Sequence, residues 1–96
     1  MKEPSHVAYR RGTFTISGHM VRQNPEELLC VFARVVVLEV MRDEFTDSFR
    51  YLAVSPDFKL WNPIEASEPP AYMPMLTVQT SEDGTQTTKL VEWRSA

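Results

Sequence analysis

The sequence is poor in cysteine and glycine, and each scarcity excludes a class of protein. Cys30 is the only cysteine, so neither an internal disulfide nor a multi-cysteine zinc site can form. Its neighbours in residues 28–32 are all apolar, which predicts a buried thiol that packs as a small hydrophobe. A chain without disulfides suits a reducing compartment, and we therefore expect a cytoplasmic protein.

Sequence motifs for cofactors and metals are missing as well. The three glycines, at positions 12, 18 and 84, are too far apart to form a phosphate-binding loop. His6 and His19 have no second metal ligand at a suitable spacing. The acidic run over residues 43–47 lacks the glycine and the ligand spacing of an EF-hand loop. We expect no cofactor, no metal site and no catalytic residues, and hence a protein that is not an enzyme.

No apolar run is long enough to cross a membrane. The longest, residues 28–41, is interrupted by Arg34 and Glu39 and is shorter than the roughly 18 residues that a membrane helix needs. Residues 1–6 lack the apolar stretch of a signal peptide. We expect no membrane partner, a flexible tail over residues 1–6, and a single α+β domain over residues 7–96.

Charge is distributed unevenly along the chain, whose net charge is −3. Residues 1–24 carry four cations and one carboxylate, whereas residues 25–96 carry six cations and twelve carboxylates. Arg10, Arg11 and Arg22, together with Tyr9, form a possible basic patch on the first strand. Such a patch could bind phosphates and stack on bases, although the negative net charge makes nucleic acid an unlikely partner.

A strand followed by a helix is predicted for the first third of the chain. From residue 12, Phe14, Ile16 and Met20 alternate with polar residues, which indicates a strand that is buried on one side. Asn24 suits a helix N-cap, and Pro25 suits the first helical position. Two glutamates follow, where carboxylates favour the positive end of the helix dipole.

The end of this helix is open to two interpretations. One is a long helix over about residues 25–42, apolar nearly all round, whose second covered side could be a symmetry mate in a homodimer. The other ends the helix near Ala33 and continues as a strand, which the β-branched residues 35–37 favour. A hairpin then pairs Glu39 with Arg50, an opposite-charge pair of the kind that sheets reward. The long helix is our main prediction.

Further strands are predicted over residues 48–54, 75–81 and 85–94. Gly84 supplies the turn of the last hairpin because glycine accepts a positive φ. This hairpin pairs Leu76 with Val91. The expected fold is α+β: one main helix on a curled antiparallel sheet of four to five strands, in two layers.

The loop over residues 61–74 is the strongest candidate for a binding site. We expect a partner protein to contact Trp61, Pro69, Pro70, Tyr72 and Met73, because proline lowers the entropy of a free loop and aromatic residues favour interfaces. In the alternative, Trp61, Tyr72 and Met73 fold back to cover the core. We expect a small non-enzymatic interaction module: a regulator, inhibitor or adaptor, such as a bacterial or phage accessory protein.

Two other functions remain open from the sequence. One is nucleic-acid contact through the basic first strand. The other is a small-ligand pocket between helix and sheet, which could also support weak catalysis. Asp57 or His19 would supply its polar group, and five aromatic residues would line it: Phe14, Phe49, Tyr51, Trp61 and Trp93.

Overall fold

Seven elements follow one another in the computed structural model, which describes residues 10–96. Strand β1 (Arg11–Ser17) leads into two short helices, α1 (Gly18–Gln23) and α2 (Pro25–Phe32). The remaining strands are β2 (Val36–Asp43), β3 (Ser48–Val54), β4 (Ala71–Thr80) and β5 (Gln86–Ser95). The predicted tail, residues 1–6, lies outside the described residues.

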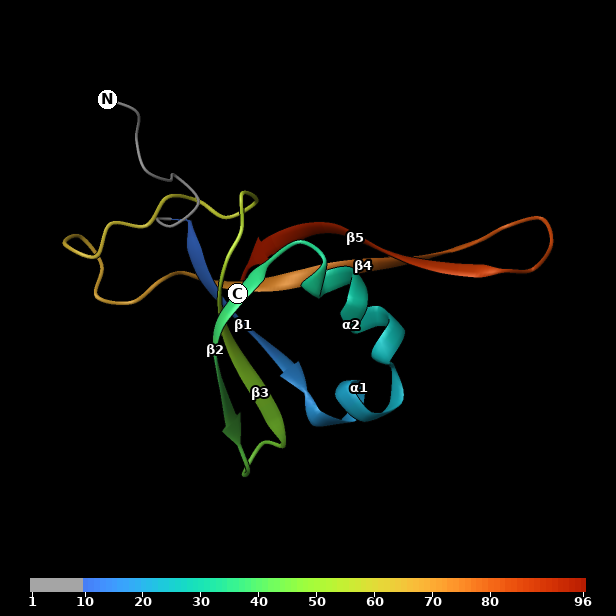
Figure 1. Cartoon of the computed structure of the whole chain (residues 1–96), viewed down its shortest axis with the longest axis horizontal. Helices are drawn as coiled ribbons and strands as arrows, with labels where there is room; N and C mark the ends of the chain where they lie inside the picture. Colours follow the sequence, from blue (N-terminus) through green and yellow to red (C-terminus); the bar gives the residue numbers. More distant parts are fainter. Residues whose placement is uncertain (1–9) are drawn as a thin grey trace.

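The five strands form one open sheet in the order β2-β3-β1-β4-β5, so the fold is α+β as predicted (Figure 1). The sheet is mixed, which corrects the prediction of a purely antiparallel one. Strand β1 pairs antiparallel with β3 but parallel with β4, through Thr13 with Ala71 and Phe14 with Tyr72. Strand β3 ends opposite the start of β1, and the connection keeps the chain at that end of the sheet, so β4 begins there and runs in the direction of β1.

The prediction of a long helix over residues 25–42 is wrong. Helix α2 ends at Phe32, where the amide of Ala33 donates to Leu29, and the chain continues as β2. The shorter alternative, with an end near Ala33, is confirmed. β-branched residues favour extended backbone, and pairing with β3 supplies the hydrogen bonds that decide the conformation. Two short helices thus replace the one main helix, and the two-layer packing stays a prediction.

The first strand is shorter than predicted from the alternation of apolar and polar residues, which extends to Met20. Strand β1 ends at Ser17, whose hydroxyl accepts a hydrogen bond from the amide of Met20 and caps α1. His19 and Met20 are therefore helical. Serine favours this position because its short side chain satisfies a free helix amide. The buried face of the strand, Phe14 and Ile16, is as predicted.

Both hairpins exist, but the predicted register fails beside each turn. From the turn to Glu39, β2 and β3 keep one register, which places Glu39 opposite Leu52 and not Arg50. Beside the last turn, Leu76 lies opposite Leu90 and not Val91, and only beyond the bulge, as in Met75 with Glu92, does the predicted register hold. The residues that form each turn set the register beside it, and a bulge farther along each hairpin then changes it. The turn itself is as predicted, with Gly84 at a φ of 86°.

The core gathers residues of β1, α2, β3, β4 and the connection between β3 and β4. Its buried apolar residues are Phe14, Ile16, Leu28, Val31, Ala53, Phe58 and Tyr72. Half-buried Tyr51 and Trp93 each place a ring centroid 5.2 Å from that of Phe14, so the aromatic side chains fill this space themselves. Cys30 is half-buried, and its thiol donates to the carbonyl oxygen of Thr88 over 2.8 Å.

Candidate interaction surface

The predicted loop residues lie in different environments. Tyr72 belongs to β4 and is only 7% exposed. Its ring stacks on Phe58 with centroids 4.5 Å apart, and its hydroxyl accepts a hydrogen bond from the amide of Lys59. Gly12 makes room for this ring, since a Cβ there would lie 2.6 Å from it. Tyr72 thus covers the core, as the alternative interpretation had it.

The rest of the loop is ordered by its own backbone. The indole N–H of half-buried Trp61 donates to the carbonyl oxygen of Ala66 over 2.9 Å. Pro69 and Pro70 are half-buried, and the carbonyl of Pro70 accepts from the amide of Thr13 in β1. Met73 lies in β4 and is 51% exposed. The structure therefore does not gather the predicted residues into one surface.

The predicted basic patch is not assembled either. Arg10 donates to the carbonyl oxygen of Phe58 over 2.8 Å, which ties the start of β1 to the core. Arg22 lies on α1 and not on the first strand. Arg11 begins β1 at its opposite end, about 20 Å away at the usual rise per residue. Tyr9 lies outside the described residues.

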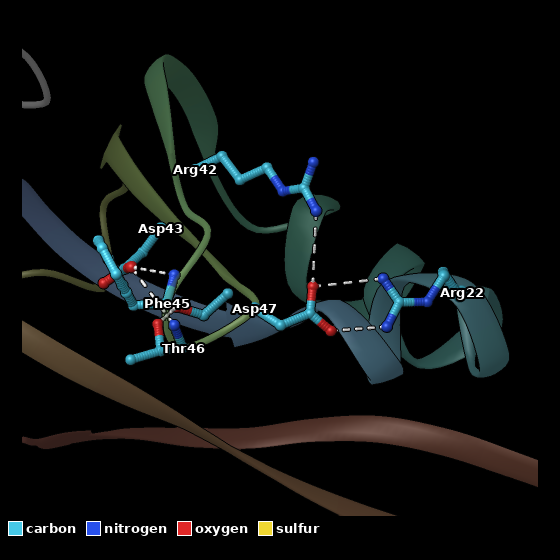
Figure 2. Close-up of polar contacts among 7 residues, drawn as sticks. Arg22, Arg42, Asp43, Phe45, Thr46 and Asp47 are labelled. Atoms are coloured by element: carbon cyan, nitrogen blue, oxygen red, sulfur yellow. Dashed lines mark hydrogen bonds and ion pairs between the residues drawn. The ribbon is translucent and has the colours of Figure 1, made fainter.

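Arg22 belongs to a cluster that joins the β2–β3 turn to α1 (Figure 2). Its guanidinium donates two hydrogen bonds to the carboxylate of Asp47, the shorter over 2.6 Å, and Arg42 lies 3.8 Å from the same carboxylate. These contacts hold the pKa of Asp47 below its usual range, chiefly through the hydrogen bonds from Arg22. The amide of Gly18 also donates to the Asp47 carbonyl oxygen. The cluster positions the hairpin that carries β2.

A second ion pair lies beside the other end of the sheet. Arg34 donates two hydrogen bonds to Asp57, over 2.6 and 3.0 Å, and they lower the pKa of Asp57. A depression of about 320 Å³ opens here to solvent, with Trp93 among its lining residues. The buried indole N–H of Trp93 comes near Asp57 but has no hydrogen-bond partner among the described residues. The charged groups at this depression are thus already engaged, since Arg34 pairs with Asp57 and Glu92 pairs with Arg94.

Strand β2 pairs with β3 on one side only and exposes a series of apolar side chains. All eight of its residues are exposed. Its apolar members are Val36 (62%), Val37 (39%), Leu38 (47%), Val40 (51%) and Met41 (56%). The strand lies at the edge of the sheet, so one row of its backbone amides and carbonyls has no neighbouring strand (Figure 1). The long-helix prediction hid this feature, although the β-branched run at residues 35–37 was its signal.

A groove of about 170 Å³ adjoins this edge on the sheet face away from the helices. Glu39 pairs with Leu52 and Met41 with Arg50, so these four side chains share that face. Thr13 of β1, opposite Leu52, lies on the same face. The end of the long loop completes the lining, so that the full set is Thr13, Glu39, Met41, Arg50, Leu52, Glu68 and Pro69. The groove is therefore an apolar depression with charged side chains around it.

Comparison with known proteins does not place this chain in a family. No family model, no curated protein and no solved structure matches this chain. Within residues 10–96, no helix has the length and apolar character to span a membrane. The same residues contain no cluster of three or more histidine, cysteine or carboxylate side chains that could hold a metal ion.

Proposed function

We propose that this chain is a small, non-enzymatic, cytoplasmic protein-interaction module, of the kind that serves as a regulator, inhibitor or adaptor. It binds an extended segment of a partner protein along β2. One observation carries the proposal: an edge strand of eight residues that is exposed throughout and apolar at five of its first six positions. Monomeric proteins seldom leave such an edge bare, because it recruits further strands.

Strand addition suits this edge in both backbone and side chains. A segment laid along β2 would pair with the free row of amides and carbonyls, which supplies affinity independent of sequence. Its alternate side chains would meet the sheet face that carries the groove, which supplies specificity. Pro69 brings the end of the predicted binding loop to the same groove. Of the residues predicted from the sequence, Pro69 thus has the clearest role in partner contact.

The dimensions of the groove favour a protein partner over a small ligand. Its volume of about 170 Å³ is below the roughly 300–1,000 Å³ usual for small-molecule sites. Tyr51 and Trp93, predicted to line a ligand cavity, both pack against Phe14, a third ring of the predicted lining. Nucleic-acid binding is disfavoured because Arg10 and Arg22 are engaged within the protein.

The test is a matched pair of substitutions on the two edge strands. Peptides selected from a phage-displayed random dodecapeptide library would be assayed against Val40→Lys in β2 and Val91→Lys in β5. Both valines are exposed, at 51% and 63%, and both changes add one charge. We expect Val40→Lys to weaken the selected peptides at least tenfold and Val91→Lys to leave them unchanged. Equal affinity for both variants contradicts the proposal, provided that circular dichroism shows intact folds.

A further inference from the structure

The groove beside β2 carries an excess of negative charge that no ion pair within the described residues neutralises. Its charged lining residues are Glu39, Glu68 and Arg50. None of the three takes part in an ion pair or a side-chain hydrogen bond among residues 10–96, where four ion pairs join other side chains. Two carboxylates and one guanidinium leave one negative charge uncompensated at this site. Residues 25–96 as a whole also carry more carboxylates than cations.

Glu39 holds the most informative position of the three. It lies on the exposed edge strand, opposite Leu52 on one side and with an open position on the other. A strand added to β2 places one of its residues directly opposite Glu39, with Cβ atoms about 5 Å apart. An opposite charge there stabilises the pair, and a like charge destabilises it. The residue opposite Glu39 is therefore where the edge discriminates between partners.

A second copy of the chain satisfies this position poorly. If β2 of one copy paired antiparallel with β2 of a second copy about a two-fold axis, the two strands would form one continuous sheet. The side chains that share a face in one copy would then lie on the same side of the sheet in the other copy. Over the regular part of β2, residues 39–43, Glu39 then faces another Glu39, Met41 or Asp43. Arg42 is never available, because it pairs with Phe49 and lies on the opposite face from Glu39. Self-pairing thus offers no cation at this position.

We infer, on the basis of the proposed function, that the partner of β2 is an extended protein segment with a lysine or arginine opposite Glu39. The flanking side chain on the same face, two residues away, is apolar and enters the groove between Met41, Leu52 and Pro69. In a strand, every second side chain points to the same face. A basic residue followed two positions later by an apolar residue therefore places one side chain opposite Glu39 and the other in the groove. The segment is rich in β-branched or aromatic residues, since these suit added strands.

The experiment compares charge reversal inside and outside the groove. Dodecapeptides selected from the random phage library on the wild-type protein would be sequenced and their affinities measured for Glu39→Lys and Glu82→Lys. Glu82 is an exposed glutamate in the β4–β5 turn, so the two variants change net charge equally. We expect lysine or arginine to be enriched two positions from an apolar residue. Glu39→Lys should weaken these peptides about threefold or more, as reversal of a cross-strand charge pair implies, and Glu82→Lys should not.

Every outcome decides between the alternatives. Neutral or acidic peptides that still depend on Val40 overturn the inferred partner chemistry and leave the proposed function standing. Peptides indifferent to both Val40→Lys and Glu39→Lys overturn both. A third outcome is that no peptide is enriched, and that light scattering shows a wild-type dimer which Val40→Lys converts to a monomer. This result assigns the edge to a second copy of the chain and overturns the inference. Failure to enrich any peptide with a monomeric protein likewise overturns it.

Discussion

Replacement of Gly18 by alanine should destabilise the fold through one identifiable contact. A Cβ at this position would lie 2.7 Å from Cγ of Asp47. Asp47 has little freedom to withdraw, because its backbone sits at a φ of 49° and its carboxylate is held by Arg22. Forced overpacking of this kind costs about 1–3 kcal/mol. Taken alone, helix propensity would predict the opposite sign, since Gly18 begins α1.

The magnitude can be measured by urea unfolding followed through tryptophan fluorescence. With a slope of about 1–3 kcal/mol per molar urea, typical of small proteins, the midpoint for Gly18→Ala should fall by about 1 M. Asp47→Gly removes the obstructing carboxylate and suits the positive φ. In that background, Gly18→Ala should become neutral or stabilising by about 0.4–1 kcal/mol, the usual gain from a compatible glycine replacement.

A third variant separates the steric contact from the ion pair. Asp47→Asn keeps the shape of the side chain and removes its charge, so Gly18→Ala should remain destabilising in this background. Exposed ion pairs contribute only about 0–1 kcal/mol, and loss of the Arg22 contact alone is too small to explain the full effect. An equal loss of stability from Gly18→Ala in the wild-type and Asp47→Gly backgrounds would refute the steric argument.

Two further changes test the core and the second ion pair. Tyr72→Phe removes the acceptor for the amide of Lys59 while the ring stays stacked on Phe58, so urea unfolding should show a loss of about 1 kcal/mol; unchanged stability would contradict the hydrogen bond. Asp57 has a pKa below its unfolded value of about 3.9, so its pairing with Arg34 stabilises the fold above that pH. This stabilisation is lost as the pH falls through the lowered pKa, and Arg34→Ala should raise the pKa of Asp57 in an NMR titration.

Features that depend on one or two adjacent residues were predictable from the sequence. The turn at Gly84 follows from the positive φ that glycine accepts, and the start of α2 follows from Pro25 and the two glutamates after it. The buried face of β1, with Phe14 and Ile16, follows from two-residue alternation. In each case the local backbone or the period of one strand decides the outcome, so no distant residue is needed.

The candidate binding surface was only partly predictable. Pro69 lines the groove and comes from the predicted loop, whereas Tyr72 from the same loop is buried against Phe58. The same composition serves both roles, because an aromatic side chain favours an interface and a core for the same reason, the burial of apolar area. The exposed edge at β2 was missed because a mostly apolar segment such as residues 35–41 is compatible with both a helix and a strand.

The sequence by itself determined the α+β class, the helix start at Pro25, the last hairpin and the apolar face of the first strand. Only the tertiary structure decided that residues 36–43 form β2, which residues pair in both hairpins, and that β4 lies parallel to β1. The physical reason is the range of the interactions. Local preferences differ by about 1 kcal/mol or less per residue, so pairing with a strand distant in the sequence outweighs them.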